Sequence, residues 1–173
     1  MNTSKHLVTA VLASLAITAV GQHKDTTPCP MMQIDKHSHG VDARGDMAMG
    51  FSHEKTQHHF RLFKDGGSIE VVVKSPSDKD QIQAIRDHLK MIKGMFAGGD
   101  FHLPMFIHDR VVPGQKTMEA LKKKITYSYS DLTTGARVRM QTGNPKALAA
   151  IHNFLKFQVE DHRTGDSKQI ERP

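Results

Sequence analysis

Residues 58–73, with the sequence HHFRLFKDGGSIEVVV, decide how this chain folds. Apolar and polar residues alternate on both sides of a central Asp-Gly-Gly, which is typical of strands with one buried face. Glycine tolerates the backbone angles that tight hairpin turns require. The stretch therefore predicts a hairpin that turns at Asp65-Gly66-Gly67. The side chains expected to face the interior are Phe60, Leu62, Ile69, Val71 and Val73.

A helix is expected directly after this hairpin. Apolar residues recur at spacings of three and four, as on one face of an amphipathic helix. Ser77 and Asp80 are suited to cap its beginning, and Gly98-Gly99 is suited to end it. The residues of the apolar face are Ile82, Ile85, Leu89, Ile92 and Phe96. The first part of the chain thus predicts a ββα unit.

The same ββα pattern occurs a second time. Strands are expected at 125–129 and 136–140, and Asn144-Pro145 is a favoured helix start. The helices align at an offset of 66 residues, whereas the strands need offsets near 65 and 67, so we expect hairpin loops of different length. The fold class predicted is α+β: a duplicated ββα unit forming a four-stranded antiparallel sheet with two helices packed on one face. The alternative is that two unrelated ββα units look alike at this level.

The N-terminus has the features of a signal peptide, residues 1–21. One charge, Lys5, precedes an apolar run of about 14 residues, which is short of the roughly 20 that span a membrane. Small residues favour cleavage between Gly21 and Gln22. This predicts a periplasmic or secreted protein with no transmembrane segment after cleavage. An uncleaved anchor or a buried helix is the alternative.

The remaining chain divides by composition. Residues 22–47 are polar and are expected to form a flexible arm that contains histidine and methionine. Residues 48–166 are expected to form the α+β domain, and residues 167–173 a tail. The domain divides into a first repeat at about 56–100, a crossover loop at 101–117 and a second repeat at about 118–166. Cys29 is the single cysteine, so no internal disulfide can form, although Cys29 could pair between chains or bind a metal.

The charge is mildly basic, with 24 Lys and Arg against 18 Asp and Glu. The positive residues are scattered, and the short run at 122–124 is more typical of a solvated element end than of a nucleic-acid site. Nucleic-acid binding is therefore not expected, whereas an anionic ligand or surface stays open.

Histidine and methionine are the candidate ligand residues, with 12 and 10 copies. Imidazole and thioether together favour copper over zinc, and the chain has no CxxC or HExxH zinc pattern. His58 shares the inward face of its strand with Phe60, so a hydrogen-bonded core histidine is the alternative there, while His59 points outward and is the better surface ligand. Two clusters supply the candidate metal ligands, one near the start of the first repeat and one in the crossover loop: Met49, His53, His58 and His59, and then His102, Met105 and His108, with Asp109 beside them.

Three segments, 48–60, 104–109 and 147–158, resemble a family of small secreted bacterial proteins. The resemblance covers about residues 43–166. Some members carry the label "aspartate carbamoyltransferase", an activity that implies a chain about twice as long with a Ser-Thr-Arg-Thr phosphate-binding segment. This sequence has no such segment. The resemblance thus implies a bacterial extracytoplasmic domain and supplies no activity.

Three hypotheses follow. The first is an exported binding protein that holds copper, or with less support zinc, through convergence of the two histidine clusters. The second is a metal-free module that docks an envelope or other protein partner through an open sheet face or hairpin edge. The third is an enzyme, for which His58, His108 and Asp109 are the first candidates.

Overall fold

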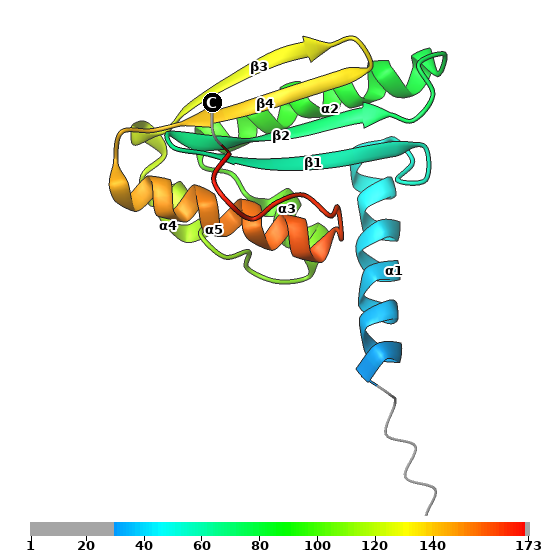
Figure 1. Ribbon diagram of the computed structural model, residues 1–173, viewed down its shortest axis with the longest axis horizontal. Helices are drawn as coiled ribbons and strands as arrows, with labels where there is room; N and C mark the ends of the chain where they lie inside the picture. Colours follow the sequence, from blue (N-terminus) through cyan, green and yellow to red (C-terminus); the bar gives the residue numbers. More distant parts are fainter. Residues whose placement is uncertain (1–29, 172–173) are drawn as a thin grey trace, which may run out of the picture.

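The computed structural model describes residues 30–171 and shows an α+β fold (Figure 1). The predicted signal peptide, its cleavage site between Gly21 and Gln22, and Cys29 lie outside these residues. Along the described part of the chain, no helix combines the length and the apolar character needed to cross a membrane.

A four-stranded antiparallel sheet forms one layer, as predicted. Its strands are β1 (Thr56–Phe63), β2 (Gly66–Val73), β3 (Thr126–Leu132) and β4 (Gly135–Gln141). Their order is β1-β2-β4-β3, so the second strand of each hairpin lies in the centre. One face of the sheet is apolar and buried under the helices, because every second residue points to it. This alternation is the signal that made the strands visible in the sequence.

Both hairpin turns contain two residues, 64–65 in the first and 133–134 in the second, because Phe63 pairs with Gly66 and Leu132 with Gly135. The expectation of loops with different lengths is therefore wrong. The difference falls instead between strand and helix, where the first repeat uses residues 74–78 and the second only 142–144. Gly66 belongs to β2 rather than to the turn, and a Cβ on it would lie 1.9 Å from the carbonyl oxygen of Met140.

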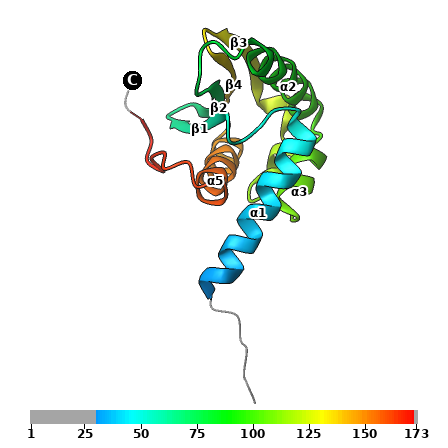
Figure 2. The ribbon, with the colours of Figure 1, turned by 90° about the vertical axis from the view of Figure 1, so that its right-hand side faces the viewer.

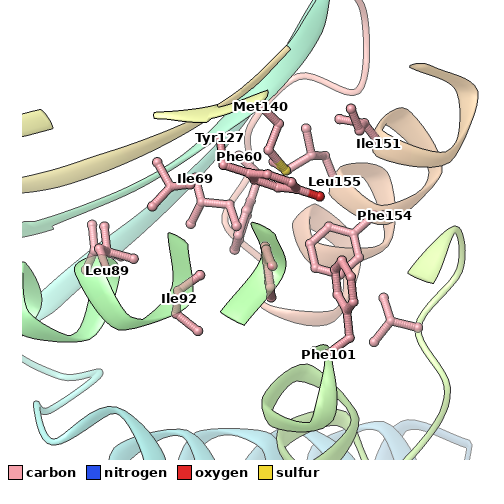
Figure 3. Close-up of a cluster of buried hydrophobic side chains, with 14 of the residues drawn as sticks. Phe60, Ile69, Leu89, Ile92, Phe101, Tyr127, Met140, Ile151, Phe154 and Leu155 are labelled. Carbon is pink, nitrogen blue, oxygen red and sulfur yellow. The ribbon is translucent and has the colours of Figure 1, made fainter. Parts of the chain in front are cut away.

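Two long helices, α2 (Lys79–Gly98) and α5 (Pro145–Asp161), cover the apolar face. Helix α2 packs chiefly against β4 and β3, whereas α5 packs against β1 and β2 (Figure 2). Each helix therefore covers mainly the hairpin of the other repeat. The two helices meet through aromatic rings, with Phe96 and Phe154 centred 5.7 Å apart. Phe101 stacks on Phe96 at 4.4 Å and lies edge-on to Phe154 at 6.0 Å (Figure 3).

The helix ends follow ordinary capping rules. The side chain of Asp78, rather than Ser77 or Asp80, accepts the backbone N–H of Gln81 at the start of α2. Gly99 ends that helix in the left-handed conformation, at φ 82°. Asn144 caps α5 by accepting two backbone N–H groups.

Replacing Asn144 by Ala is expected to lower the free energy of unfolding by about 1 kcal/mol, because the two N–H groups at the start of α5 lose their acceptor. Urea unfolding followed by circular dichroism measures the change. Asn153→Ala is the matched control, since Asn153 is exposed in the middle of the same helix. There alanine is expected to be neutral or slightly stabilising, and an equal loss in both variants would contradict the capping argument.

Helical structure also occurs where the sequence predicted irregular chain. The arm expected at 22–47 is helical from Pro30 onward, as α1 (Pro30–Met49). The crossover loop expected at 101–117 contains α3 (His102–His108) and the start of α4 (Gln115–Ala120), and the 3-10 helix η1 (Lys122–Lys124) follows it. Helix α1 projects away from the sheet (Figure 1) and packs on α3 near its C-terminal end, where Val41 is buried and Arg44 Nε donates to Ile107 O at 2.8 Å. Because few of the described side chains of α1 are buried, the sequence of this helix shows little apolar periodicity.

Candidate functional site

Four histidines line one small cavity beneath the inner face of the sheet. They come from four separate segments: His58 from β1, His88 from α2, His108 from α3 and His162 from the end of α5. The cavity measures about 60 Å³, and apart from the imidazoles and Gln158 its lining is apolar. Met49, at the end of α1, adds a thioether to the wall.

The positions of these histidines follow from local periodicity. His58 points inward with Phe60, as the alternation along β1 predicts. His88 lies three residues after Ile85 and four before Ile92, and therefore belongs to the buried face of α2. His162 follows the last residue of α5 as its C-cap.

The rings are packed closely against one another. His58 stacks on His162 with ring centroids 5.4 Å apart and planes 12° apart. His108 meets His162 edge to face at 5.0 Å, and Phe51 meets His88 in the same manner at 5.4 Å. The cluster is therefore part of the core as well as the wall of a cavity.

Burial favours the neutral form of three of the four imidazoles. It lowers the pKa of His58 to about 4, with a further lowering by His88 and a small opposing effect of Asp46. Burial likewise lowers the pKa of His88 to about 4. It also holds the pKa of His162 well below its ordinary value, with added effects of His58 and His108. At neutral pH each of these three rings has one nitrogen with a free lone pair.

The ring nitrogens of the four histidines differ in their hydrogen bonding. His108 Nδ1 lies 2.5 Å from Asp161 Oδ2, and its Nε2 lies 3.0 Å from Gln158 Oε1, so this ring ties α3 to α5. By contrast, His88 Nδ1 is buried without a hydrogen-bond partner. Such an atom calls for a partner, either a bound water or an ion.

The carboxylate beside His108 is thus Asp161 and not its neighbour Asp109. Asp109 is exposed at the C-cap of α3, in the left-handed conformation at φ 51°. Both ring nitrogens of His108 are engaged by α5. This arrangement gives no support to proton transfer by the His108 and Asp109 pair.

An open cleft of about 470 Å³ adjoins the cavity, and His58 and His162 line both spaces. The stacked pair therefore forms part of the wall between solvent and interior. His53 lines the cleft and is fixed by Asp46, which accepts its backbone N–H at 2.8 Å and lies 2.9 Å from its Nδ1. The cleft gives small solutes a route to the two imidazoles.

The predicted ligands divide between these spaces and the surface. Met49, His58 and His108 line the cavity, and His53 lines the cleft. His59 points away from the cavity and pairs with Asp166 at 3.0 Å. His102 is 88% exposed and pairs with Asp100 at 2.8 Å. Met105 is half-buried on α3 and lines neither space.

The sequence interpretation missed two residues of the cavity. His88 and His162 were not among the candidate ligands, although the spacing of His88 after Ile85 and before Ile92 places it on the buried face of α2. The described residues contain no group of three or more His, Cys, Asp or Glu side chains arranged to hold a metal ion. A site built from two imidazoles and a thioether would not form such a group.

Fold and site together define a small α+β protein with a cavity lined by four imidazoles. Comparison with known proteins finds no matching family model, no matching curated protein and no matching solved structure. The function is therefore argued from the cavity and its chemistry.

Proposed function

We propose that this is an exported binding protein that holds one copper(I) ion in the buried cavity. The observation that supports it most is His88 Nδ1, which is buried without a hydrogen-bond partner in a ring that shares the cavity wall with His58 and the thioether of Met49. The signal-peptide features of residues 1–21 support export.

The donor atoms suit a soft ion. Leaving a buried polar atom unsatisfied costs about 1–3 kcal/mol, and a bound ion at His88 Nδ1 would remove that cost. Thioether sulfur selects copper(I) among the common metals, and neutral imidazole binds it as well. The apolar lining of the cavity favours a singly charged ion over a doubly charged one, because desolvation is less costly.

Zinc fits less well. Structural zinc sites use four N, S or O ligands in a tetrahedron, whereas His108 already has both ring nitrogens engaged. Copper(I) is satisfied by two or three ligands, including thioether. A cavity of about 60 Å³ has room for an ion and a few waters, whereas pockets for drug-sized ligands measure about 300–1,000 Å³.

Anaerobic titration of the metal-free protein with copper(I), against a chromophoric chelator, tests the proposal. We expect about one equivalent to bind, and His88→Leu and Met49→Leu each to weaken binding at least tenfold, because each removes a ligand while keeping an apolar side chain of similar size. His102→Gln is the control, since its ring is exposed and outside the cavity. Affinity weaker than micromolar, or wild-type affinity in a folded His88→Leu variant, would overturn the copper assignment.

The docking-module hypothesis has less support. A protein-docking surface usually shows a contiguous exposed apolar patch. The docking hypothesis placed this patch on the open sheet face or a hairpin edge, whereas the exposed large apolar side chains of the described residues lie on α1, α2, α3, the loop after α3 and the C-terminal segment, and none lies on a strand. They are Met47, Met91, Phe106, Val111 and Ile170.

A further inference from the structure

The outer face of the sheet, opposite the cavity, has a hollow of about 360 Å³. Strand register explains it: Arg61 of β1 and Arg139 of β4 both lie opposite Ser68 of β2, and Arg137 of β4 lies opposite Glu70 of β2. The small serine between two arginines leaves the space. The residues that line the hollow are Arg61, Phe63, Glu70, Arg137, Arg139 and Glu171.

Glu70 holds two of the guanidinium groups in place. Its side chain is 8% exposed, and one carboxylate oxygen lies 2.9 Å from Arg137 Nε and 3.5 Å from Arg61 Nε. Both Nε atoms are buried without a well-aligned hydrogen bond. One carboxylate is thus shared by two cations, and the remaining positive charge faces the hollow.

Arg139 is engaged differently. Its guanidinium packs over the ring of Phe63 at 4.5 Å, and its Nη1 donates to Gly67 O at 2.9 Å. It also pairs with Asp65 at the hairpin turn. Arg139 is therefore held in place at the side of the hollow, and Arg61 and Arg137 supply the positive charge that a ligand can bind.

A carboxylate of the chain itself already lies at this charge. Beyond α5, the chain returns along β1 (Figure 1), where Ile170 pairs with Leu62 and Glu171 N–H donates to Leu62 O at 2.8 Å. The carboxylate of Glu171 contacts Arg61 Nη1 at 3.3 and 3.4 Å, which is long for a charge-assisted hydrogen bond. Glu171 thus neutralises Arg61 only loosely.

We propose that this hollow is a binding site for an oxyanion group, phosphate or carboxylate, held by Arg61 and Arg137 in competition with Glu171. The planar guanidinium presents paired donors that match both anions. Arg139 is paired with Asp65, and Arg61 and Arg137 share Glu70, so displacement of Glu171 leaves one uncompensated positive charge. The site is on the opposite face from the cavity and does not depend on the copper proposal.

Titration of the ¹⁵N-labelled protein with inorganic phosphate, and separately with succinate, at constant ionic strength tests the inference through the arginine Nε–H resonances. We expect saturable shifts of Arg61 and Arg137. Arg61→Gln should weaken binding about tenfold. Glu171→Gln should tighten it about threefold or more, since the competing charge is lost.

Glu160→Gln is the matched control, because it makes the same charge change at an exposed residue outside the hollow. Its affinity should equal that of the wild type. Saturation by phosphate alone or by succinate alone identifies which oxyanion the site prefers. Equal shifts with chloride, or an unchanged affinity in the Glu171→Gln variant, would overturn the inference.

Discussion

Acidification from about pH 7 to about pH 4.5 is expected to lower the free energy of unfolding by roughly 3–5 kcal/mol. The main cause is burial of His58 and His88, which lowers the pKa of each from 6.5 to about 4 in the folded protein, and burial lowers the pKa of His162 in the same direction. Below about pH 6.5 these rings bind protons in the unfolded chain but stay neutral in the fold. Stability from these groups is therefore complete above pH 6.5 and falls as the pH approaches 4.

The carboxylates with lowered pKa values titrate in a lower pH range than these histidines. Hydrogen bonds from Gln141 and Arg139 hold the pKa of Asp65 below 3.8, and those from His102 do the same for Asp100. Stability linked to these carboxylates is lost only as the pH falls below about 4. The range between about pH 6.5 and 4.5 therefore reports mainly on the buried imidazoles.

Urea unfolding of the metal-free protein at a series of pH values measures this dependence. His88→Leu should flatten it by about a third, because one of the three rings with a lowered pKa is gone. His102→Gln should leave it unchanged, since His102 is almost fully exposed. A wild-type unfolding midpoint that stays constant between about pH 6.5 and 4.5 would contradict the assignment of neutral buried rings.

Gly135→Ala is expected to destabilise the protein by about 3–5 kcal/mol or to prevent folding. Gly135 begins β4 and pairs with both Leu132 and Val72. A Cβ there would lie 1.9 Å from the carbonyl oxygen of Val71, which is backbone and cannot rotate away. The two central strands would have to separate, and ladder hydrogen bonds would be lost.

The control for this substitution is Gly94→Ala. Gly94 is exposed within α2, and a Cβ there meets nothing within 4 Å. Alanine should therefore stabilise that helix by about 0.5–1 kcal/mol. Urea midpoints of the two variants should shift in opposite directions, and a Gly135→Ala protein as stable as the wild type would show that the close approach to β2 is not obligatory.

The sheet and its two covering helices could be predicted because each carries its own periodicity. Phe60 and Leu62 alternate along a strand, and Ile85 and Leu89 recur along a helix, so both elements are readable locally. Helix α1 carries no such pattern, since Val41 and Met49 are the buried apolar side chains among the described ones of this helix. The turn residues were misplaced by one or two positions because Gly66 supports close strand approach rather than the turn itself.

The cavity was only partly predictable. His58 and His108 were named from residue type, and the inward direction of His58 followed from strand alternation. Their meeting with His88 and His162 depends on how four separate segments pack, which no local pattern encodes. The same applies to Asp161, which lies 53 residues from His108 in sequence and still supplies its carboxylate.

Because each long helix covers the hairpin of the other repeat, the order of synthesis limits when the core can form. Helix α5, which shields the first hairpin, leaves the ribosome after all four strands of the sheet. Until residues 145–161 have emerged, the apolar side of that hairpin has no permanent cover, so neither repeat can complete its own core in advance. We therefore expect nascent chains truncated before this point to require chaperone protection, and the fold to form in one late, all-or-none step.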